Sequence, residues 1–141
     1  MRLVDTNVLI YAAQHTPGDA VKRRQARALL REPDLALSVQ VLQEFYWRAT
    51  HPAHPGRLEP DHAMGFLRLF WDKPIQHMTR EVFETAVAIS QRFQISYWDG
   101  AILAAARALG CDAVYSEDLS SEQDYDGVRV INPFRGSGEG D

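Results

Sequence analysis

Short strand-like segments alternate with helix-like segments along the chain, and this alternation constrains the fold most. The strand-like segments are short apolar runs at 2–5, 35–38, 75–79, 112–116 and 128–131. The helix-like segments between them are amphipathic or largely apolar, at 6–14, 20–31, 39–50, 61–71, 80–93 and 96–110. Such alternation predicts an α/β fold with a short, mostly parallel sheet of four to five strands and helices on both faces.

Capping residues and apolar stripes define the helices further. Asp19 and Ser38 are predicted to cap the helices that follow them, and Gly110 is predicted to end the last helix. Apolar spacing gives each of two helices a core stripe. These stripes are Val39, Leu42, Phe45, Tyr46 and Ala49 in one helix, and Val82, Phe83, Ala86, Ile89 and Phe93 in the other.

The length of 141 residues fits one domain, expected at 1–134, followed by a Gly-rich tail at 135–141 that is expected to be disordered. The single cysteine, Cys111, excludes an intrachain disulfide and a Cys-rich zinc site. No apolar run approaches the roughly 20 residues of a membrane span, and Asp5 and Asn7 interrupt any signal-peptide-like stretch. We therefore expect a cytoplasmic protein with no membrane partner.

Acidic residues follow two of the predicted strands. Asp5 ends the first strand, and Asp118 lies two residues beyond the fourth. Ligands of parallel sheets bind beyond the carboxyl ends of strands, where the strand order reverses. Asp5 can also be read as a helix cap, although Thr6 and Asn7 could cap equally well.

Two further acids have ordinary structural explanations. Asp99 stands three residues after Ser96, which is the spacing of a capping box. Glu44 lies opposite the apolar stripe of its helix, so periodicity alone predicts a solvated side chain. Charges about 4 Å apart repel by roughly 4 kcal/mol at an effective dielectric near 20, so acids that share one sheet edge must protonate or bind cations.

The segments "LVDTNVLIYA", "SVQVLQEFYW", "ISYWDGAILAAARALGC" and "VYSEDL" resemble, in order and spacing, the four acidic motifs of PIN-domain ribonucleases. The likeness is greatest to VapC-type toxins of prokaryotic toxin–antitoxin pairs, and it extends to "VRVINPF". The resemblance implies a PIN-like three-layer α/β/α fold. It also implies an acidic metal site, with Mg²⁺ or Mn²⁺ held by Asp5, Glu44, Asp99 and Asp118 and supported by Thr6, Asn7 and Ser116.

One departure from the family pattern concerns the fourth acid. The loop after Asp118 is longer and more acidic than the short turn usual there, which leaves Glu117 and Asp124 as rival ligands. The number of metal ions, one or two, stays open at this point.

The resemblance implies metal-assisted hydrolysis of RNA that leaves 5′-phosphate and 3′-hydroxyl ends. It also implies a homodimer and a small antitoxin whose tail occupies the active-site groove. Candidate RNA contacts are a basic ridge of Arg23, Arg27 and Arg31, together with Trp47 and Arg48. The apolar residues of 61–71 suggest a dimer face: Met64, Phe66, Leu67, Phe70 and Trp71.

Two alternatives compete with the nuclease. The chain could be a PIN-like module that binds RNA or protein without catalysis. It could also be a haloacid dehalogenase-like phosphatase with Asp5 as nucleophile. That family needs a second acid two residues further on, where this chain has Asn7.

Overall fold

The computed structural model describes residues 1–119 and 123–134, which form one six-stranded sheet with helices around it. The strand order is β3-β2-β1-β4-β6-β5, and all neighbours are parallel except β5 and β6. The strands are β1 (Arg2–Val4), β2 (Leu35–Ser38), β3 (Ile75–Gln76), β4 (Ala113–Tyr115), β5 (Asp124–Tyr125) and β6 (Val128–Ile131). The predicted α/β class with a mostly parallel sheet is therefore confirmed.

The sheet has one strand more than the sequence analysis expected. The additional strand, β5, pairs with β6 through a turn in which Asp126 and Gly127 both have positive φ, 55° and 97°. An Asp-Gly pair with two positive φ angles is characteristic of a tight hairpin. A strand of two residues is too short to show periodicity, so the Asp-Gly turn is the sequence signal for it, and that signal was overlooked.

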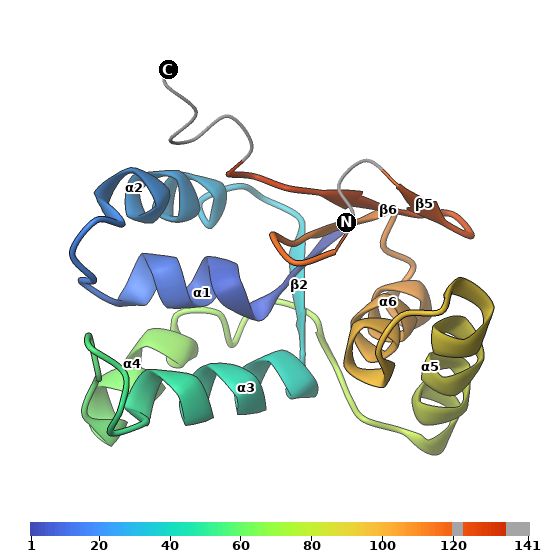
Figure 1. Ribbon diagram of the computed structural model, residues 1–141, viewed down its shortest axis with the longest axis horizontal. Coiled ribbons are helices and arrows are strands. Elements are labelled where there is room, and N and C mark those ends of the chain that lie inside the picture. Colours follow the sequence, from blue (N-terminus) through green and yellow to red (C-terminus); the bar gives the residue numbers. More distant parts are fainter. Residues whose placement is uncertain (120–122, 135–141) are drawn as a thin grey trace.

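Six helices cover the sheet. They are α1 (Thr6–Ala13), α2 (Ala20–Leu29), α3 (Val39–Thr50), α4 (Pro60–Arg68), α5 (Arg80–Phe93) and α6 (Tyr97–Leu109). Figure 1 shows α1 to α4 on one side of β2 and α5 and α6 on the other. Two of the predicted caps are confirmed, since Ser38 Oγ accepts from the Val41 amide and Gly110 ends α6 at φ 78°. Asp19 precedes α2 but makes no side-chain capping bond.

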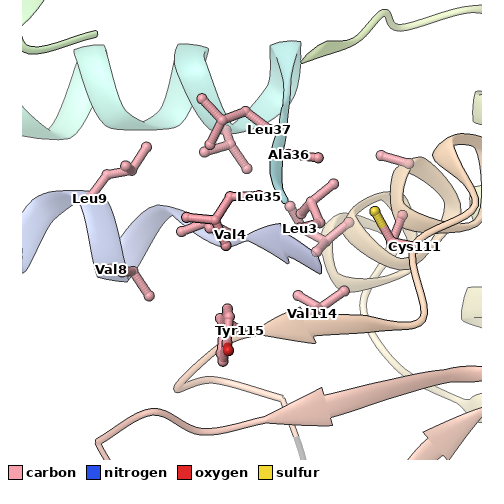
Figure 2. Close-up of a cluster of buried hydrophobic side chains, with 14 of the residues drawn as sticks. Leu3, Val4, Val8, Leu9, Leu35, Ala36, Leu37, Cys111, Val114 and Tyr115 are labelled. Atoms are coloured by element: carbon pink, nitrogen blue, oxygen red, sulfur yellow. The ribbon is translucent and has the colours of Figure 1, made fainter. Parts of the chain in front are cut away.

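The core lies around the central strand β1, which hydrogen-bonds to β2 and β4. Leu3, Val4 and Val114 from these strands are fully buried (Figure 2). A parallel strand covered on both faces needs apolar residues at consecutive positions, which is the pattern of the first strand. No described helix is long and apolar enough to cross a membrane.

Two expectations about apolar residues are wrong in detail. Tyr46 is 38% exposed and Phe83 is 49% exposed, so neither belongs to its predicted core stripe. The expected dimer face of 61–71 is partly internal, because Leu67 and Phe70 are buried and Phe66 stacks on Phe45 with ring centroids 5.3 Å apart. Trp71 is exposed, and the dimer face stays a prediction. The expected disordered tail at 135–141 lies outside the described residues.

Candidate functional site

The carboxyl ends of β1 and β4 meet where the strand order reverses. In the sheet, β2 and β3 lie in order on one side of β1. The next strand, β4, lies beside β1 on its other side, so the direction in which strands are added reverses there. Asp5 follows β1 directly, and its amide donates to the Tyr115 carbonyl at the end of β4, 3.0 Å away. Ser116 follows β4, so Asp5 and Ser116 lie together at the edge of the sheet where ligands of parallel sheets are expected to bind.

Asp5 is a buried carboxylate held by two hydrogen bonds. Its Oδ1 accepts from the Thr6 amide at 2.7 Å, and its Oδ2 accepts from the Ser116 hydroxyl at 2.8 Å. The first bond caps α1, so the interpretation of Asp5 as a helix cap is confirmed. Its role as a metal ligand stays a prediction. Burial raises the pKa of Asp5 to about 6, and the negative charges of Glu44 and Asp118 act in the same direction.

Glu44 faces this site and is half-buried, which corrects the solvated position that its periodicity predicted. Its Oε2 lies 3.4 Å from the donating hydroxyl of Thr6, and its Oε1 accepts from Gln40 Nε2 at 2.7 Å. The helix α3 packs against α1 and α6 as well as against the sheet, so the side opposite its core stripe is partly covered.

Gln40 is a site residue that the sequence analysis missed. It is buried and also donates to the Trp98 carbonyl at 3.3 Å, which ties α3 to α6. A glutamine next to an apolar stripe gives no sequence signal of this role, because its partners come from tertiary packing.

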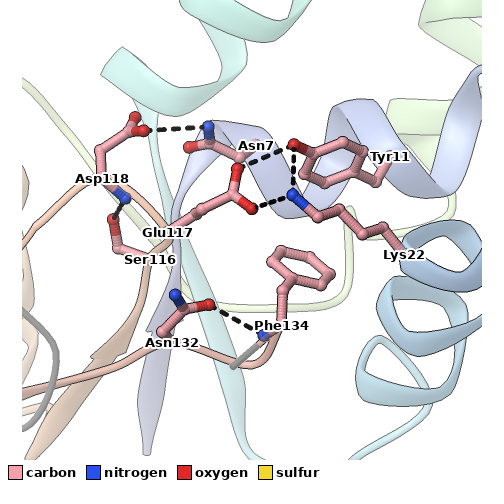
Figure 3. Close-up of polar contacts among 8 residues, drawn as sticks. All are labelled: Asn7, Tyr11, Lys22, Ser116, Glu117, Asp118, Asn132 and Phe134. Carbon is pink, nitrogen blue, oxygen red and sulfur yellow. Dashed lines mark hydrogen bonds and ion pairs between the residues drawn. The ribbon is translucent and has the colours of Figure 1, made fainter. Parts of the chain in front are cut away.

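Asp118 and Asp99 form the other half of the acidic group. Asn7 Nδ2 donates to Asp118 Oδ1 at 3.4 Å, and the Asp118 amide donates to Ser116 Oγ at 3.2 Å (Figure 3). Asp99 stands in the first turn of α6, where its amide donates to Ser96 Oγ as predicted. Partial burial raises the pKa of Asp99, and the charge of Asp118 raises it further. Asp118 therefore lies electrostatically close to both Asp5 and Asp99.

The rival acids of the loop are engaged elsewhere. Glu117 accepts from the Tyr11 hydroxyl at 2.8 Å and pairs with the Lys22 ammonium (Figure 3). Asp124 lies in β5 and accepts from the Gly127 amide at 3.0 Å, which closes the hairpin turn. Of these candidates, Asp118 is the acid whose side chain contacts the Asp5 end of α1.

The donor chemistry of this group suits a hard divalent cation. The side chains offer carboxylate and amide oxygens, and Asn7 Oδ1 is buried without a hydrogen-bond partner. Within 1–119 and 123–134, however, no three Asp, Glu, His or Cys side chains lie close enough to hold one metal ion. A cation would therefore have to draw the carboxylates together, and relief of their mutual repulsion favours that movement.

The predicted basic ridge is not continuous. Arg27 Nε donates to the Ala12 carbonyl at 2.9 Å, and α2 ends at Leu29, so Arg31 lies beyond the helix. Of that ridge, Arg23 is half-buried and Arg31 is exposed.

The aromatic candidates lie beside the acids. Trp47 and Arg48 line a groove of about 600 Å³ together with Glu44, Gln40, Gln43 and Trp98. Trp98, in the largely apolar segment 96–110, is 63% exposed. A cavity of about 700 Å³ along α5 and α6 contains none of the four acids.

Comparisons with known proteins agree with this arrangement. The sequence profile of the PIN domain matches residues 2–122. The fold is similar to the VapC20 toxin of Mycobacterium tuberculosis, which cleaves the sarcin–ricin loop. That match has a TM-score of 0.65 and 22% identity over 84% of this chain and 90% of that one.

Two further structures are similar as well. A toxin–antitoxin complex from Klebsiella pneumoniae matches with a TM-score of 0.68 and 21% identity over 94% of this chain and 98% of that one. FitAcB from Neisseria gonorrhoeae matches with a TM-score of 0.63 and 19% identity, over 96% and 99%. At such identities the likeness shows the fold alone. No curated protein matches the chain in sequence.

Proposed function

The chain belongs to the PIN-domain family, and from this premise we propose that it is a metal-dependent ribonuclease that acts as the toxin of a toxin–antitoxin pair. The observation that carries the proposal is the buried Asp5 at the sheet switch point, with the charges of Glu44 and Asp118 near it. The similar structures include a toxin that cleaves the sarcin–ricin loop and a toxin–antitoxin complex, and both support the same activity. Membership of this family replaces the phosphatase alternative.

Asp5 and Asp99 are proposed as the central metal ligands, with Glu44 and Asp118 completing the set. When bound, Mg²⁺ or Mn²⁺ would neutralise these charges, lower the pKa of an attacking water and stabilise the departing oxygen of the phosphodiester. Without such a cation, the acids around Asp5 disfavour the approach of a phosphodiester to that position, whatever binds the rest of the RNA.

The polar residues around the acids have positioning roles in this proposal. Ser116 donates to Asp5 and accepts from the Asp118 amide, so one hydroxyl fixes two acids. Thr6 and Asn7 donate to Glu44 and Asp118 from the first turn of α1. As the resemblance to PIN-domain ribonucleases implies, the proposed hydrolysis would leave a 5′-phosphate and a 3′-hydroxyl.

The proposal extends to partners and location. A small antitoxin protein would cover the acidic residues, the active form would be a homodimer, and the protein would work in the cytoplasm. The exposed side chains of Leu69 and Trp71 leave part of the predicted dimer face of 61–71 available for this contact.

The test compares purified wild type with Asp5→Asn and Asp99→Asn on a panel of RNAs, with Mg²⁺, with Mn²⁺ and with a chelator. Asp72→Asn, at an exposed position after α4, is the matched control. We expect cleavage by the wild type and the control only with metal, products with 5′-phosphate ends, and loss of cleavage in both site variants.

A second readout does not depend on catalysis. Mg²⁺ or Mn²⁺ is expected to raise the melting temperature of the wild type and of Asp72→Asn, but not that of Asp5→Asn. A wild type that neither cleaves any RNA nor responds to either metal would leave the non-catalytic binding module as the better description.

A further inference from the structure

Two exposed tryptophans border the acidic cluster, and the proposed chemistry gives them no role. Trp47 is 64% exposed and Trp98 is 63% exposed, although both sit on well-packed helices. They line one groove of about 600 Å³, and Glu44 of the cluster lines the same groove. Large exposed aromatic rings next to a functional site indicate a binding surface.

We propose that this groove binds an unpaired nucleobase of the RNA next to the cleaved phosphodiester, by stacking on Trp47 and Trp98. The inference rests on the proposed ribonuclease function and adds the residues that would hold a base of its substrate. A phosphodiester joins two nucleosides, so the bases that flank a phosphodiester at the carboxylates lie only one sugar away from it. Because Glu44 lines the groove, the groove is within reach of one of these bases.

Both rings are held in place by their neighbours. The Trp47 ring lies 4.7 Å from the His51 ring, and the Trp98 ring packs edge-on against Tyr97 at 5.0 Å. Gln40 also anchors the Trp98 carbonyl to α3. Because aromatic platforms that are already ordered lose little entropy on binding, they suit stacking by any of the four bases.

The groups beside the two tryptophans favour a nucleotide over a peptide or a second copy of the chain. Arg48 supplies a cation for phosphate, and it also lines a neighbouring cavity of about 230 Å³ with Asn7. Arg48 thus lies between the groove and the first turn of α1. Gln43, which is exposed, contributes an amide group. Amides can both donate to and accept from base edges.

The experiment measures binding rather than cleavage, in a chelator. The probes are a short oligouridylate, a short oligoadenylate and a ribose-phosphate chain of the same length without bases. The wild type is expected to bind both oligonucleotides roughly 5- to 150-fold more tightly than the abasic chain, because stacking acts only on bases. The double variant Trp47→Ala/Trp98→Ala is expected to lose this preference and to keep its residual affinity for the abasic chain.

Two matched variants separate stacking from other effects. Trp71→Ala removes an exposed tryptophan (49%) that does not line the groove, and it should keep the full preference for bases. Arg48→Gln should weaken binding of all three probes similarly and reduce the salt dependence of binding. Far-UV circular dichroism and melting temperatures verify that each variant is folded.

The results that overturn the inference are distinct from those that overturn the ribonuclease. Equal binding of the abasic and base-carrying chains by the wild type refutes the stacking groove, even if RNA is cleaved with metal. Dissociation of a wild-type dimer by the double variant, with its base preference intact, assigns the groove to a second copy instead. Conversely, the wild type could bind base-carrying chains more tightly than the abasic chain and yet cleave no RNA with either metal. That result would support the stacking groove and refute the ribonuclease function.

Discussion

The variant Asp5→Asn is expected to stabilise the protein in the absence of divalent cations, at neutral pH. The Asp5 carboxylate is 6% exposed and lies near the charges of Glu44 and Asp118. An amide of the same shape removes the charge and can still accept from the Thr6 amide that Asp5 caps. A functional residue whose replacement stabilises the fold is typical of active sites.

The magnitude follows from the pKa of Asp5, which burial raises from 3.8 to about 6. An acid with a raised pKa in the folded state binds its proton more tightly there than in the unfolded chain. Its ionisation therefore costs nothing below about pH 4, and the full cost of about 3 kcal/mol is reached above about pH 6. Asp5→Asn avoids this cost, so the gain in unfolding free energy is at most about 3 kcal/mol. This corresponds to a rise in melting temperature of at most roughly 6–12 °C. Ser116, which donates to Asp5 in the wild type, would have to accept from the new amide, and this lowers the gain.

The assay is urea or thermal unfolding in a chelator, at about pH 7.5 and again at about pH 4. Asp5→Asn should be more stable than the wild type at the higher pH and nearly equal to it at the lower pH. Asp72→Asn should match the wild type at both. A variant less stable than the wild type at about pH 7.5, or an advantage that grows on acidification, would refute the reasoning about the buried charge.

Two further predictions concern the framework of the site. A Cβ on Gly100 would lie 2.6 Å from a carbonyl oxygen of α5, so Gly100→Ala should lower the free energy of unfolding by several kcal/mol. Gly65 in α4 has open space around it, so Gly65→Ala should raise the free energy of unfolding by about 0.5–1 kcal/mol. Equal effects of the two changes in chemical denaturation would contradict the described packing of α5 against α6. Lys22→Met leaves the Glu117 carboxylate without its ion pair and should destabilise the fold by about 1–3 kcal/mol. The control Arg24→Met, at an exposed position of the same helix, should change stability by less than about 0.5 kcal/mol. If both variants unfold at the same urea concentration, the pair contributes nothing.

The strand ends and helix caps could be predicted because their causes are local. Asp5 after an apolar run, Ser38 before an amphipathic helix and Gly110 after an apolar one each have a short-range signal, and each occupies the expected place. The switch point followed from the alternation of strands and helices, which restricts the possible topologies.

The features that could not be predicted depend on how helices pack against one another. Periodicity assigns Glu44 to solvent because it describes one helix in isolation. In the fold, α1 contacts that side of α3 through Thr6, and α6 contacts it through the Trp98 carbonyl. The exposure of Trp98 has the same origin, since an apolar sequence does not reveal where a helix emerges from its neighbours. The hairpin of β5 and β6 did carry a signal, the Asp-Gly pair at 126–127 between short β-prone stretches.

Gln40 joins the carboxylates to the groove through a single nitrogen. Its Nε2 donates to Glu44 Oε1 at 2.7 Å and to the Trp98 backbone at 3.3 Å. If Glu44 turned toward a metal ion, Gln40 Nε2 would lose the hydrogen bond to Glu44, and its hydrogen bond to the Trp98 carbonyl would change. Metal binding would then alter the position of Trp98. Linkage requires that base binding in the groove change the affinity for the metal ion by the same factor as the metal ion changes the affinity for the base. Ion titrations with and without a short oligonucleotide would measure this cooperativity as one number.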